Sequence, residues 1–364
     1  MSIDLVLPIA GESSRYPDTR PKWLLTHPSG NLMLTESIRG LNPGQFNKII
    51  IIGLEKHEDK YGYSESLYEE LQENYNFPVE DIDLILLKKE TTSESETIYK
   101  GLSRAGKQSG PMLVKDSDNY FEMRWSDLSD RNLVAIASLY DFDSIDPGNK
   151  SYIAFGENET VVNIAEKEII SPWFCVGAYG FNKTEHFLEY FEKISQKNIK
   201  GELYVSHIIY KMLQEGKLFF GTKVDRYTDW GTLEDWKSYR QNHVTLFVDI
   251  DGVLVKNSSK HFDPKWGETG GISPNIEALQ DIFETGKSYI LLTTSRTEEY
   301  REKTKAQLND LNIPYNQLIM GLPHSKRVLI NDYSNTNGYP SALSINLSRD
   351  KENLKEKLAS LIDH

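Results

Sequence analysis

Residues 3–15 read Ile3-Asp4-Leu5-Val6-Leu7-Pro8-Ile9-Ala10-Gly11-Glu12-Ser13-Ser14-Arg15, and Arg20-Pro21-Lys22 follows shortly after. The apolar start of this stretch predicts a buried strand over Ile3–Ile9. Ala10 and Gly11 then form a small-residue turn in which backbone N–H groups can approach phosphate oxygens. Arg15 can bind phosphate through two hydrogen bonds, and Lys22 adds a second positive charge. An ordinary strand-to-helix turn with surface cations would show the same pattern. Motifs elsewhere in the chain are therefore needed to distinguish a phosphate site from such a turn.

Short apolar runs alternate with amphipathic stretches along the whole chain, which is the pattern of an α/β protein. In the first part, strands are predicted over Ile3–Ile9, Lys48–Gly53, Asp83–Lys88, Met112–Lys115, Leu133–Leu139, Ser151–Phe155 and Trp173–Phe181. Helices are predicted over Met33–Gly40, Ser64–Glu73, Glu96–Ala105, Thr184–Ile194, Leu203–Gln214 and Leu233–Asn242.

A second α/β series begins at Thr245. Its predicted strands are Thr245–Ile250, Tyr289–Thr293, Gln317–Met320, Val328–Ile330 and Ala342–Ile345, and its predicted helices are Asn275–Thr285, Glu298–Leu311 and Lys351–Ile362. The sequence has no internal repeat and no linker rich in Pro, Gly or Ser. We therefore place a short boundary near Gln241–Val244, with one domain over residues 1–243 and a second over 244–364.

Length and composition agree with two globular domains. The chain has 364 residues, 38% hydrophobic and 26% charged, and domains usually hold about 100–200 residues. No run of about 18 apolar residues is present, so we expect no membrane span. The N-terminus lacks the basic and long apolar regions of a secretory signal, and the single cysteine, Cys175, cannot form an internal disulfide. These features favour a cytoplasmic protein.

The charge balance excludes one class of partner. The formal net charge is −13, from 41 basic and 54 acidic side chains, whereas nucleic-acid binding draws its affinity from a basic surface. Small anionic substrates remain compatible with this balance, because they need only local positive charge or a metal ion.

Two aspartates in the first domain follow short β-type runs. Asp118 lies in Lys115-Asp116-Ser117-Asp118, directly after an apolar strand, and Asp229 ends the run at 227–229. The C-terminal ends of strands are where α/β folds bind ligands. Two carboxylates together with phosphate oxygens make an all-oxygen site that suits Mg²⁺, with Mn²⁺ as the alternative. Each aspartate alone could equally be a turn or helix-capping residue.

Residues 1 to about 240 resemble the sugar-phosphate nucleotidyltransferases, a GT-A-like Rossmann family. The resemblance rests on AGESSR…RPKWLL, KDSDNYF, AEKEIISPWFCVGAYGF, GELYVSHIIY and TDWGTLEDW, in the family's order. It implies that Arg15 binds the β- and γ-phosphates of an NTP and that Lys22 binds the α-phosphate. It also implies that Asp118 and Asp229 hold Mg²⁺. By the same resemblance, Lys167 binds the acceptor's phosphate, Ala10 and Gly11 line the nucleotide, and Ser93, Ser95 and Thr97 lie where the family reads base and ribose.

The phosphate loop departs from the family's usual Gly-Gly-x-Gly-Thr-Arg. Glu12 and Ser13 stand at glycine-type positions. Since the family's hexose-1-phosphate enzymes keep the usual loop, the departure favours CTP as the nucleotide. The acceptor is expected to be a small phosphorylated sugar or polyol.

The second series opens with Leu246-Phe247-Val248-Asp249-Ile250-Asp251-Gly252, a buried strand that ends in two carboxylates. Side chains two apart in a strand point to one side, so both aspartates can face one phosphate. A further strand ends in Thr293 and Thr294. Lys326 follows later, and Leu329-Ile330-Asn331-Asp332 reads as another strand that ends in a carboxylate. A strand-ending Asp-Gly turn without catalytic function is the alternative for the first motif, as a surface lysine is for Lys326.

This pattern resembles the haloacid dehalogenase (HAD) superfamily of phosphatases over residues 244–364. The resemblance implies that Asp249 is the nucleophile, that Asp251 is the general acid and base, and that Lys326 stabilises negative charge. It further implies that Thr294, in preference to Thr293, binds the phosphoryl group and that Asp332 shares Mg²⁺ with Asp249. Asn331 stands where the family often has a second aspartate. The segment after the first motif leaves room for only a minimal cap.

The sequence therefore predicts a bifunctional enzyme. Its first domain would make an NDP-sugar or NDP-polyol with release of pyrophosphate, and its second would hydrolyse a phosphomonoester, in capsular or other surface polysaccharide precursor synthesis. Three alternatives stay open: a GT-A-type glycosyltransferase, a phosphatase with a nucleotide-sensing first domain, and a nucleotidyltransferase with an inactive HAD module. The order of the two reactions and the oligomeric state are not encoded in these motifs.

Overall fold

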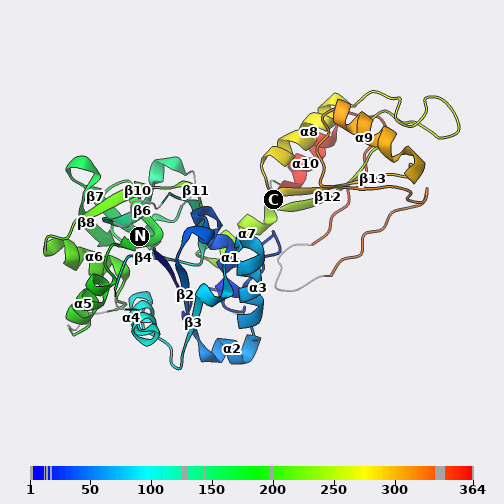
Figure 1. Cartoon of the computed structure of the whole chain (residues 1–364). Coiled ribbons are helices and arrows are strands. Elements are labelled where there is room, and N and C mark those ends of the chain that lie inside the picture. The colour runs from blue at the N-terminus through cyan, green and yellow to red at the C-terminus, as the bar shows by residue number, and fades with distance from the viewer. Residues whose placement is uncertain are drawn as a thin grey trace. The chain divides into compact units, whose positions relative to one another are not determined.

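The computed structural model describes residues 3–11, 13, 15–16, 19–107, 109–124, 130–142, 145–196, 201–332 and 341–362. The chain divides into two compact units, Met1–Lys237 and Ser238–His364. The division falls a few residues before the boundary expected from the sequence, within helix α7 (Leu233–Gln241). Figure 1 shows the helices and strands of both units.

Within the described residues, the first unit is built on a nine-stranded mixed sheet with the order β10-β6-β9-β4-β1-β2-β3, to which β7 and β8 are added beside β9. The pairs β1–β2, β2–β3, β1–β4 and β10–β6 are parallel, whereas β9 is antiparallel to β4 and β6. The strands are β1 (Asp4–Pro8), β2 (Lys48–Leu54), β3 (Ile82–Leu87), β4 (Met112–Lys115), β6 (Asn132–Ser138), β7 (Ser151–Phe155), β8 (Val161–Glu166), β9 (Trp173–Phe181) and β10 (Phe219–Lys223).

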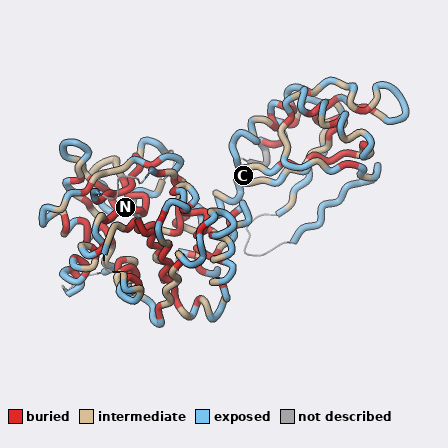
Figure 2. Tube along the Cα trace, viewed as in Figure 1, coloured by how far each residue is buried: buried red, intermediate tan, exposed pale blue. Residues whose placement is uncertain are grey.

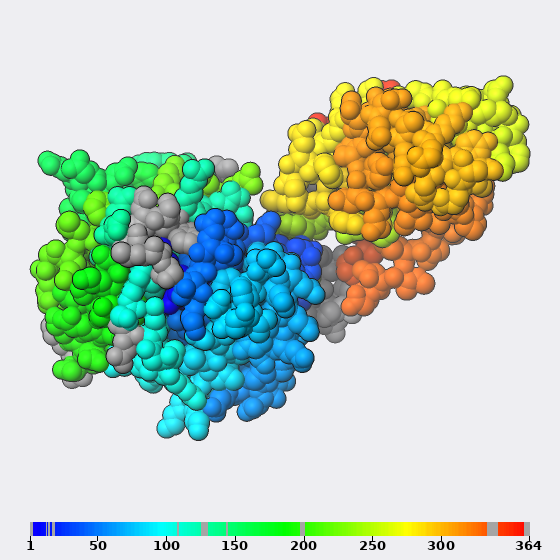
Figure 3. All heavy atoms as spheres, in the orientation of Figure 1, coloured from blue at the N-terminus to red at the C-terminus, as the bar shows by residue number. Residues whose placement is uncertain are grey.

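Helices cover both faces of this sheet. They are α1 (Met33–Ile38), α2 (Glu55–Tyr61), α3 (Ser64–Tyr75), α4 (Glu94–Ala105), α5 (Thr184–Ser195) and α6 (Val205–Gln214), and a 3₁₀ turn, η1 (Lys22–Leu24), precedes α1. In the space-filling view, the blue and cyan N-terminal part of this unit and its green C-terminal part lie on opposite sides (Figure 3). The sheet order explains this division, because β1, β2 and β3 occupy one end.

Strand alternation divides the apolar side chains of β1 between two core clusters. Leu5 and Leu7 belong to the cluster that includes side chains of α1 and α3, whereas Val6 belongs to the cluster that includes side chains of α4, α5 and α6. This is the period of two expected for a strand buried on both faces. The buried trace accordingly follows the strands through the middle of the unit (Figure 2).

A second, two-stranded sheet joins β5 (Asn119–Glu122) to β11 (Asp225–Asp229) in antiparallel register. The pairing sets Asp229 opposite Asn119. The sequence predicted neither β5 nor the strands β8 and β10, because these segments lack the strong apolar runs of the central strands. Helix α2 was also missed.

The second unit has a parallel sheet of the order β12-β13-β14, formed by β12 (Val244–Asp249), β13 (Ser288–Thr293) and β14 (Gln317–Ile319). Its helices are α8 (Ser273–Glu284), α9 (Arg301–Asp310) and α10 (Leu354–Ile362), and the 3₁₀ turn η9 (Glu298–Tyr300) leads into α9. Helices α8 and α10 lie next to each other beside the sheet (Figure 1). Their apolar faces share one core with the strands, which includes Leu279, Ile290, Leu292 and Leu358.

Two strand predictions in this unit are wrong. Neither Val328–Ile330 nor Ala342–Ile345 forms a strand in the structure. The side chains of Val328, Leu329 and Ile330 are 72%, 56% and 90% exposed, so the run does not enter the core. An apolar run is a strand only where a neighbouring strand accepts its hydrogen bonds, and the sequence pattern cannot show that partner.

Within the described residues, no helix is both long and apolar enough to cross a membrane.

Gly101 of α4 tests how closely that helix packs on the sheet. An ideal Cβ at this position would lie 2.3 Å from Ile52 Cδ1 and 2.6 Å from Ile52 Cγ2, on β2. We expect Gly101→Ala to lower the free energy of unfolding by about 1–3 kcal/mol through overpacking, measured by urea denaturation. In an open helix position the same change would raise stability by about 1 kcal/mol. A stabilised variant would therefore contradict the packing; Ser103→Ala, at an exposed position of α4, is the control.

Candidate functional site

The two predicted metal-binding carboxylates of the first unit meet because β5 pairs with β11. Asp118 immediately precedes β5, and Asp229 ends β11 opposite Asn119. The backbone N–H of Trp230 donates a hydrogen bond to the carbonyl of Asp118 at 2.8 Å. Two residues that are far apart in the sequence therefore lie beside one another.

Because Gly231 has no side chain, an open space remains beside the carboxylates of Asp118 and Asp229. A Cβ built on Gly231 would lie 3.0 Å from Asp229 Oδ1, 3.4 Å from Arg15 Nη1 and 3.7 Å from Asp118 Oδ2. The backbone N–H of Gly231 also donates to Asp229 Oδ1 at 3.0 Å. Two carboxylates and one guanidinium thus surround a position that carries no side chain.

Three cations balance these two carboxylates. Lys22 Nζ is paired with Asp118 Oδ2, and Arg15 Nη2 lies 3.5 Å from the same oxygen. Lys150 Nζ is paired with Asp229 Oδ2 and donates to Tyr227 Oη at 2.9 Å. Arg15 and Lys22 were predicted from the sequence, but Lys150 was not, because no motif surrounds it.

The electrostatics keep Asp118 ionised. Burial alone would raise the pKa of this carboxyl, but the positive charges of Lys22, Arg15 and Lys150 hold it well below its ordinary value. The carboxylate is therefore charged at neutral pH and available as an oxygen ligand.

The loop after β1 is arranged around Ser13. Its backbone is left-handed, with φ of +52°, and its side-chain oxygen accepts a hydrogen bond from the Lys22 N–H at 3.0 Å. Tyr16 N–H donates to the Ser13 carbonyl at 2.7 Å, and the Tyr16 hydroxyl donates to the Trp230 carbonyl. The bond from Tyr16 ties the loop to Trp230, the residue that follows Asp229.

Other loop positions fit a close approach of phosphate. Ala10 is buried, and a Cβ at Gly11 would meet nothing within 4 Å, so the backbone there faces open space. Glu12, one of the two departures from the family loop, lies outside the described residues.

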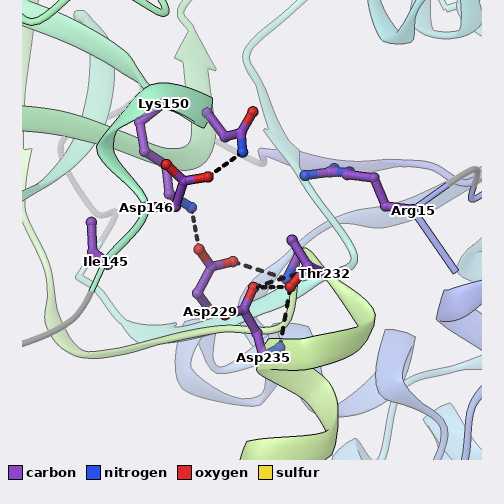
Figure 4. A pocket seen from close by; sticks show the side chains of 9 residues that line it. Arg15, Ile145, Asp146, Lys150, Asp229, Thr232 and Asp235 are labelled. Carbon is purple, nitrogen blue, oxygen red and sulfur yellow. Dashed lines mark hydrogen bonds and ion pairs between the residues drawn. The ribbon is translucent and has the colours of Figure 1, made fainter.

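A small pocket opens between the charged groups (Figure 4). Figure 4 shows Lys150 reaching Asp229 from one side, while Arg15 points toward the same space from the other. Thr232 and Asp235, at the start of α7, close the bottom of the pocket, where the Thr232 hydroxyl donates to Asp235 at 2.6 Å. The pocket is therefore lined almost wholly by polar and charged side chains.

The three hydroxyls predicted to read base and ribose have structural partners. Ser93 caps α4, where its oxygen accepts from Glu96 N–H at 3.2 Å. Ser95 donates to the carbonyl of Leu203, and Thr97 donates to the Ser93 carbonyl at 3.2 Å. All three side chains are buried. Their part in nucleotide binding stays a prediction.

Lys167, predicted to bind the acceptor, is exposed. Its ammonium donates to the Tyr204 hydroxyl at 2.7 Å. Its backbone N–H donates to the Lys150 carbonyl at 3.0 Å, so the two lysines stand at one end of the β7–β8 hairpin.

A buried lysine that the sequence analysis missed supports the turn that carries Asp118. Lys115 is fully buried, and its ammonium donates to the Asp116 carbonyl at 2.7 Å and to Asn119 Oδ1 at 2.6 Å. Burial lowers the pKa of Lys115 to about 8 despite the carboxylates nearby. Its position on a strand of apolar residues was the available signal.

The donor set at the first site fits a magnesium ion. Asp118 and Asp229 offer carboxylate oxygens to one space, and substrate phosphates would supply further oxygens. Among the described residues, no group of three or more His, Cys, Asp or Glu side chains could hold a metal. Two protein carboxylates leave coordination positions open for substrate oxygens.

In the second unit, β12 and β13 end together, with Asp249 opposite Thr293. Asp249 Oδ1 lies 3.5 Å from Arg327 Nη2. Burial and the nearby Asp251 raise the pKa of Asp249, while Arg327 opposes this shift. The cation facing Asp249 is thus Arg327, next to the predicted Lys326.

Asp251 is held by a fully buried arginine. Arg296 Nε and Nη2 each donate to one of the two Asp251 oxygens at 2.8 Å, and Arg296 Nη1 donates to Gln307 Oε1 at 2.8 Å. Ser258 donates to Asp251 at 2.7 Å, and Thr294 donates to it at 3.4 Å. Both Asp251 oxygens are thus occupied by the guanidinium, so Asp251 would have to leave Arg296 before it could reach a substrate.

The expected placement of Asp332 at the end of a strand is wrong, because the segment before it is exposed and irregular. Lys326 and Asp332 are both exposed. Among the described residues, no hydrogen bond or ion pair joins either side chain to Asp249. The structure therefore brings together Asp249, Asp251 and Thr294 but not the other two.

The Asp251–Arg296 pair generates a stability prediction. We expect Asp251→Asn to destabilise the second unit by about 3 kcal/mol or more, because it leaves a buried guanidinium without its counter-charge. Chemical denaturation of the full chain measures this change. Asp281→Asn, which breaks the exposed pair with Lys355, should cost less than about 1 kcal/mol. Equal losses in the two variants would contradict the assignment.

No family model and no curated protein matches this chain. Among solved structures, a nucleoside-diphosphate-sugar pyrophosphorylase from Vibrio cholerae RC9 has 21% identity and a TM-score of 0.54, covering 64% of this chain and 97% of its own. A putative glucose-1-phosphate thymidylyltransferase from Bacillus anthracis, in complex with a sucrose, has 18% identity and a TM-score of 0.50, covering 65% and 93%. The chain thus contains a mixed α/β fold similar to that of these sugar nucleotidyltransferase structures.

Proposed function

We propose that the first unit transfers a nucleotidyl group from an NTP to a small phosphorylated acceptor and releases pyrophosphate. The observation that carries this proposal is the meeting of Asp118 and Asp229 with Arg15, Lys22 and Lys150 around Gly231. A site of alternating carboxylates and cations suits the transfer of a phosphorus group between two anions. Similarity to solved nucleotidyltransferase folds supports it.

The reaction needs positioning more than proton transfer. An oxygen of the acceptor's phosphate attacks the α-phosphorus, the bond to the β-phosphate oxygen breaks, and pyrophosphate leaves with that electron pair. Both the nucleophile and the leaving group are already anionic, so no side chain has to act as a base. Bringing these anions into line and neutralising them supplies the rate enhancement.

Each charged side chain has a part in that task. Arg15 would bind the β- and γ-phosphates, and Lys22 would bind the α-phosphate. Asp118 and Asp229 would hold Mg²⁺, which neutralises phosphate charge when bound. Lys167 would bind the phosphate of the acceptor. CTP is the favoured nucleotide, and the product would be a CDP-sugar or CDP-polyol. The similar structures are those of a nucleoside-diphosphate-sugar pyrophosphorylase and a putative glucose-1-phosphate thymidylyltransferase.

We propose a second activity, Mg²⁺-dependent hydrolysis of a phosphomonoester, for the second unit. It is supported by the position of Asp249 at the end of a parallel strand, with Thr294 nearby and the Arg327 guanidinium facing it. Asp249 would attack phosphorus and release the alcohol, and water would then hydrolyse the aspartyl-phosphate. Asp251 would act as the general acid and then the base, which requires it to leave Arg296. Lys326 and Asp332 could take part only if their segment moves toward Asp249.

The first activity is tested by mixing each NTP with a series of sugar and polyol phosphates and measuring pyrophosphate. We expect release with CTP and one acceptor class. Lys22→Met and Asp118→Asn should each lower kcat/KM at least about 100-fold, because each removes a charge that acts on the transferred group. Lys48→Met is the control, because Lys48 pairs with Asp83 at the N-terminal ends of the parallel strands β2 and β3.

Two results would overturn the first proposal. One is the absence of pyrophosphate with every nucleotide. The other is transfer of a sugar from an NDP-sugar, which would indicate a glycosyltransferase instead.

The second activity is tested with p-nitrophenyl phosphate and Mg²⁺. We expect phosphate release that falls to the background rate in Asp249→Asn and is unchanged in Asp281→Asn, because only Asp249 can form the phospho-enzyme. Release that survives Asp249→Asn would contradict the nucleophile. No release by the unaltered chain would leave the second unit as an inactive module.

A further inference from the structure

Lys150 occupies an unusual place for a residue outside any motif. It follows the 3₁₀ turn Pro147–Asn149 and directly precedes β7. Its side chain is only 14% exposed. The ammonium reaches Asp229, bonds to the Tyr227 hydroxyl and lies 5.5 Å from the centre of the Tyr227 ring. The positive charge of this largely buried ammonium is therefore stabilised by the Asp229 carboxylate.

The two carboxylates of the site are each neutralised by one lysine. Lys22 is paired with Asp118, and Lys150 is paired with Asp229. Both oxygens of Asp229 already accept hydrogen bonds, one from Lys150 and the other from the Gly231 N–H. A metal ion binding to Asp229 would therefore compete with the Lys150 ammonium for the same negative charge.

A displaced Lys150 would need a new anion. An ammonium shielded from water is costly unless it is paired. Of the charged groups that line the pocket, Asp146 and Asp235 are already engaged, by Asn149 and by Thr232. The Arg15 guanidinium faces the same space. An incoming phosphate chain is the anion that Arg15 and Lys150 can share.

We propose that Lys150 is a phosphate-binding residue of this site, paired with Asp229 in the free protein and transferred to a phosphoryl oxygen when a metal-bound nucleotide enters. The ligand class is the polyphosphate chain of a nucleoside triphosphate or of pyrophosphate. This inference rests on the proposed function of the first unit. In the free protein, Lys150 thus takes the place of the metal's charge at Asp229. With substrate bound, it adds to the charge that neutralises the phosphates.

The test compares Lys150→Met with the unaltered full chain by calorimetric titration, using Mn²⁺ alone and then Mg²⁺ with inorganic pyrophosphate. We expect Mn²⁺ to bind about 10-fold more tightly to the variant, because Asp229 has lost its competing cation. We expect magnesium pyrophosphate to bind at least about 10-fold more weakly, because one charged hydrogen bond is lost. The two affinities should change in opposite directions. Lys48→Met, which removes the half-buried pair with Asp83, should change neither.

Other outcomes overturn the inference. If both affinities fall, Lys150 only supports Asp229; if neither changes, it has no part in binding. Thermal unfolding monitors the fold, and Lys150→Arg provides a second variant that keeps the charge. It should bind magnesium pyrophosphate within about 3-fold of the unaltered chain, and a loss as large as that of Lys150→Met would also overturn the proposal.

The two proposals fail in different ways. A chain that binds magnesium pyrophosphate through Lys150 but never releases pyrophosphate from an NTP would overturn only the proposed function. An active chain whose Lys150→Met variant binds both probes normally would overturn only the role of Lys150.

Discussion

The first unit depends on one antiparallel pairing, between the four residues of β5 and the five of β11. In the large sheet, β4 leads into the turn that carries Asp118. Only the small sheet brings Asp229 to it from far along the chain, through a register that sets Asp229 opposite Asn119. A shift of this register by one residue would turn the Asp229 side chain to the opposite face. The short pairing therefore determines whether a site exists.

Charge compensation explains why the pairing is stable. Two carboxylates brought close together in a partly buried place would repel each other and favour protonation. Here Lys22, Arg15 and Lys150 supply more positive charge than the carboxylates supply negative, and the pKa of Asp118 falls rather than rises. The second unit uses the same principle at Asp251, with a fully buried arginine. In both places the cations lie far from the carboxylates along the sequence, and the fold brings them together.

The sequence predicted what depends on local pattern. The strands β4, β7 and β9 were predicted to the residue, and Arg15 and Lys22 were recognised because they follow a buried strand and a small-residue turn. Lys150 and Arg296 were missed, because their carboxylate partners, Asp229 and Asp251, are brought to them only by the fold. The failed prediction at Val328–Ile330 has the same origin: apolar content is local, but a place in a sheet is given by neighbouring strands.

Gly231 has a consequence for how such chains can vary. Its hydrogen atom faces the gap that two carboxylates and a guanidinium border, and a methyl group there would stand 3.0 Å from Asp229 Oδ1. A homologue could keep every charged side chain and still lose this open space simply by carrying alanine or a larger residue at this position. The missing side chain of Gly231 is therefore as important to the shape of this site as its charged residues are. Surveys of related sequences should therefore score this glycine together with the ionic residues.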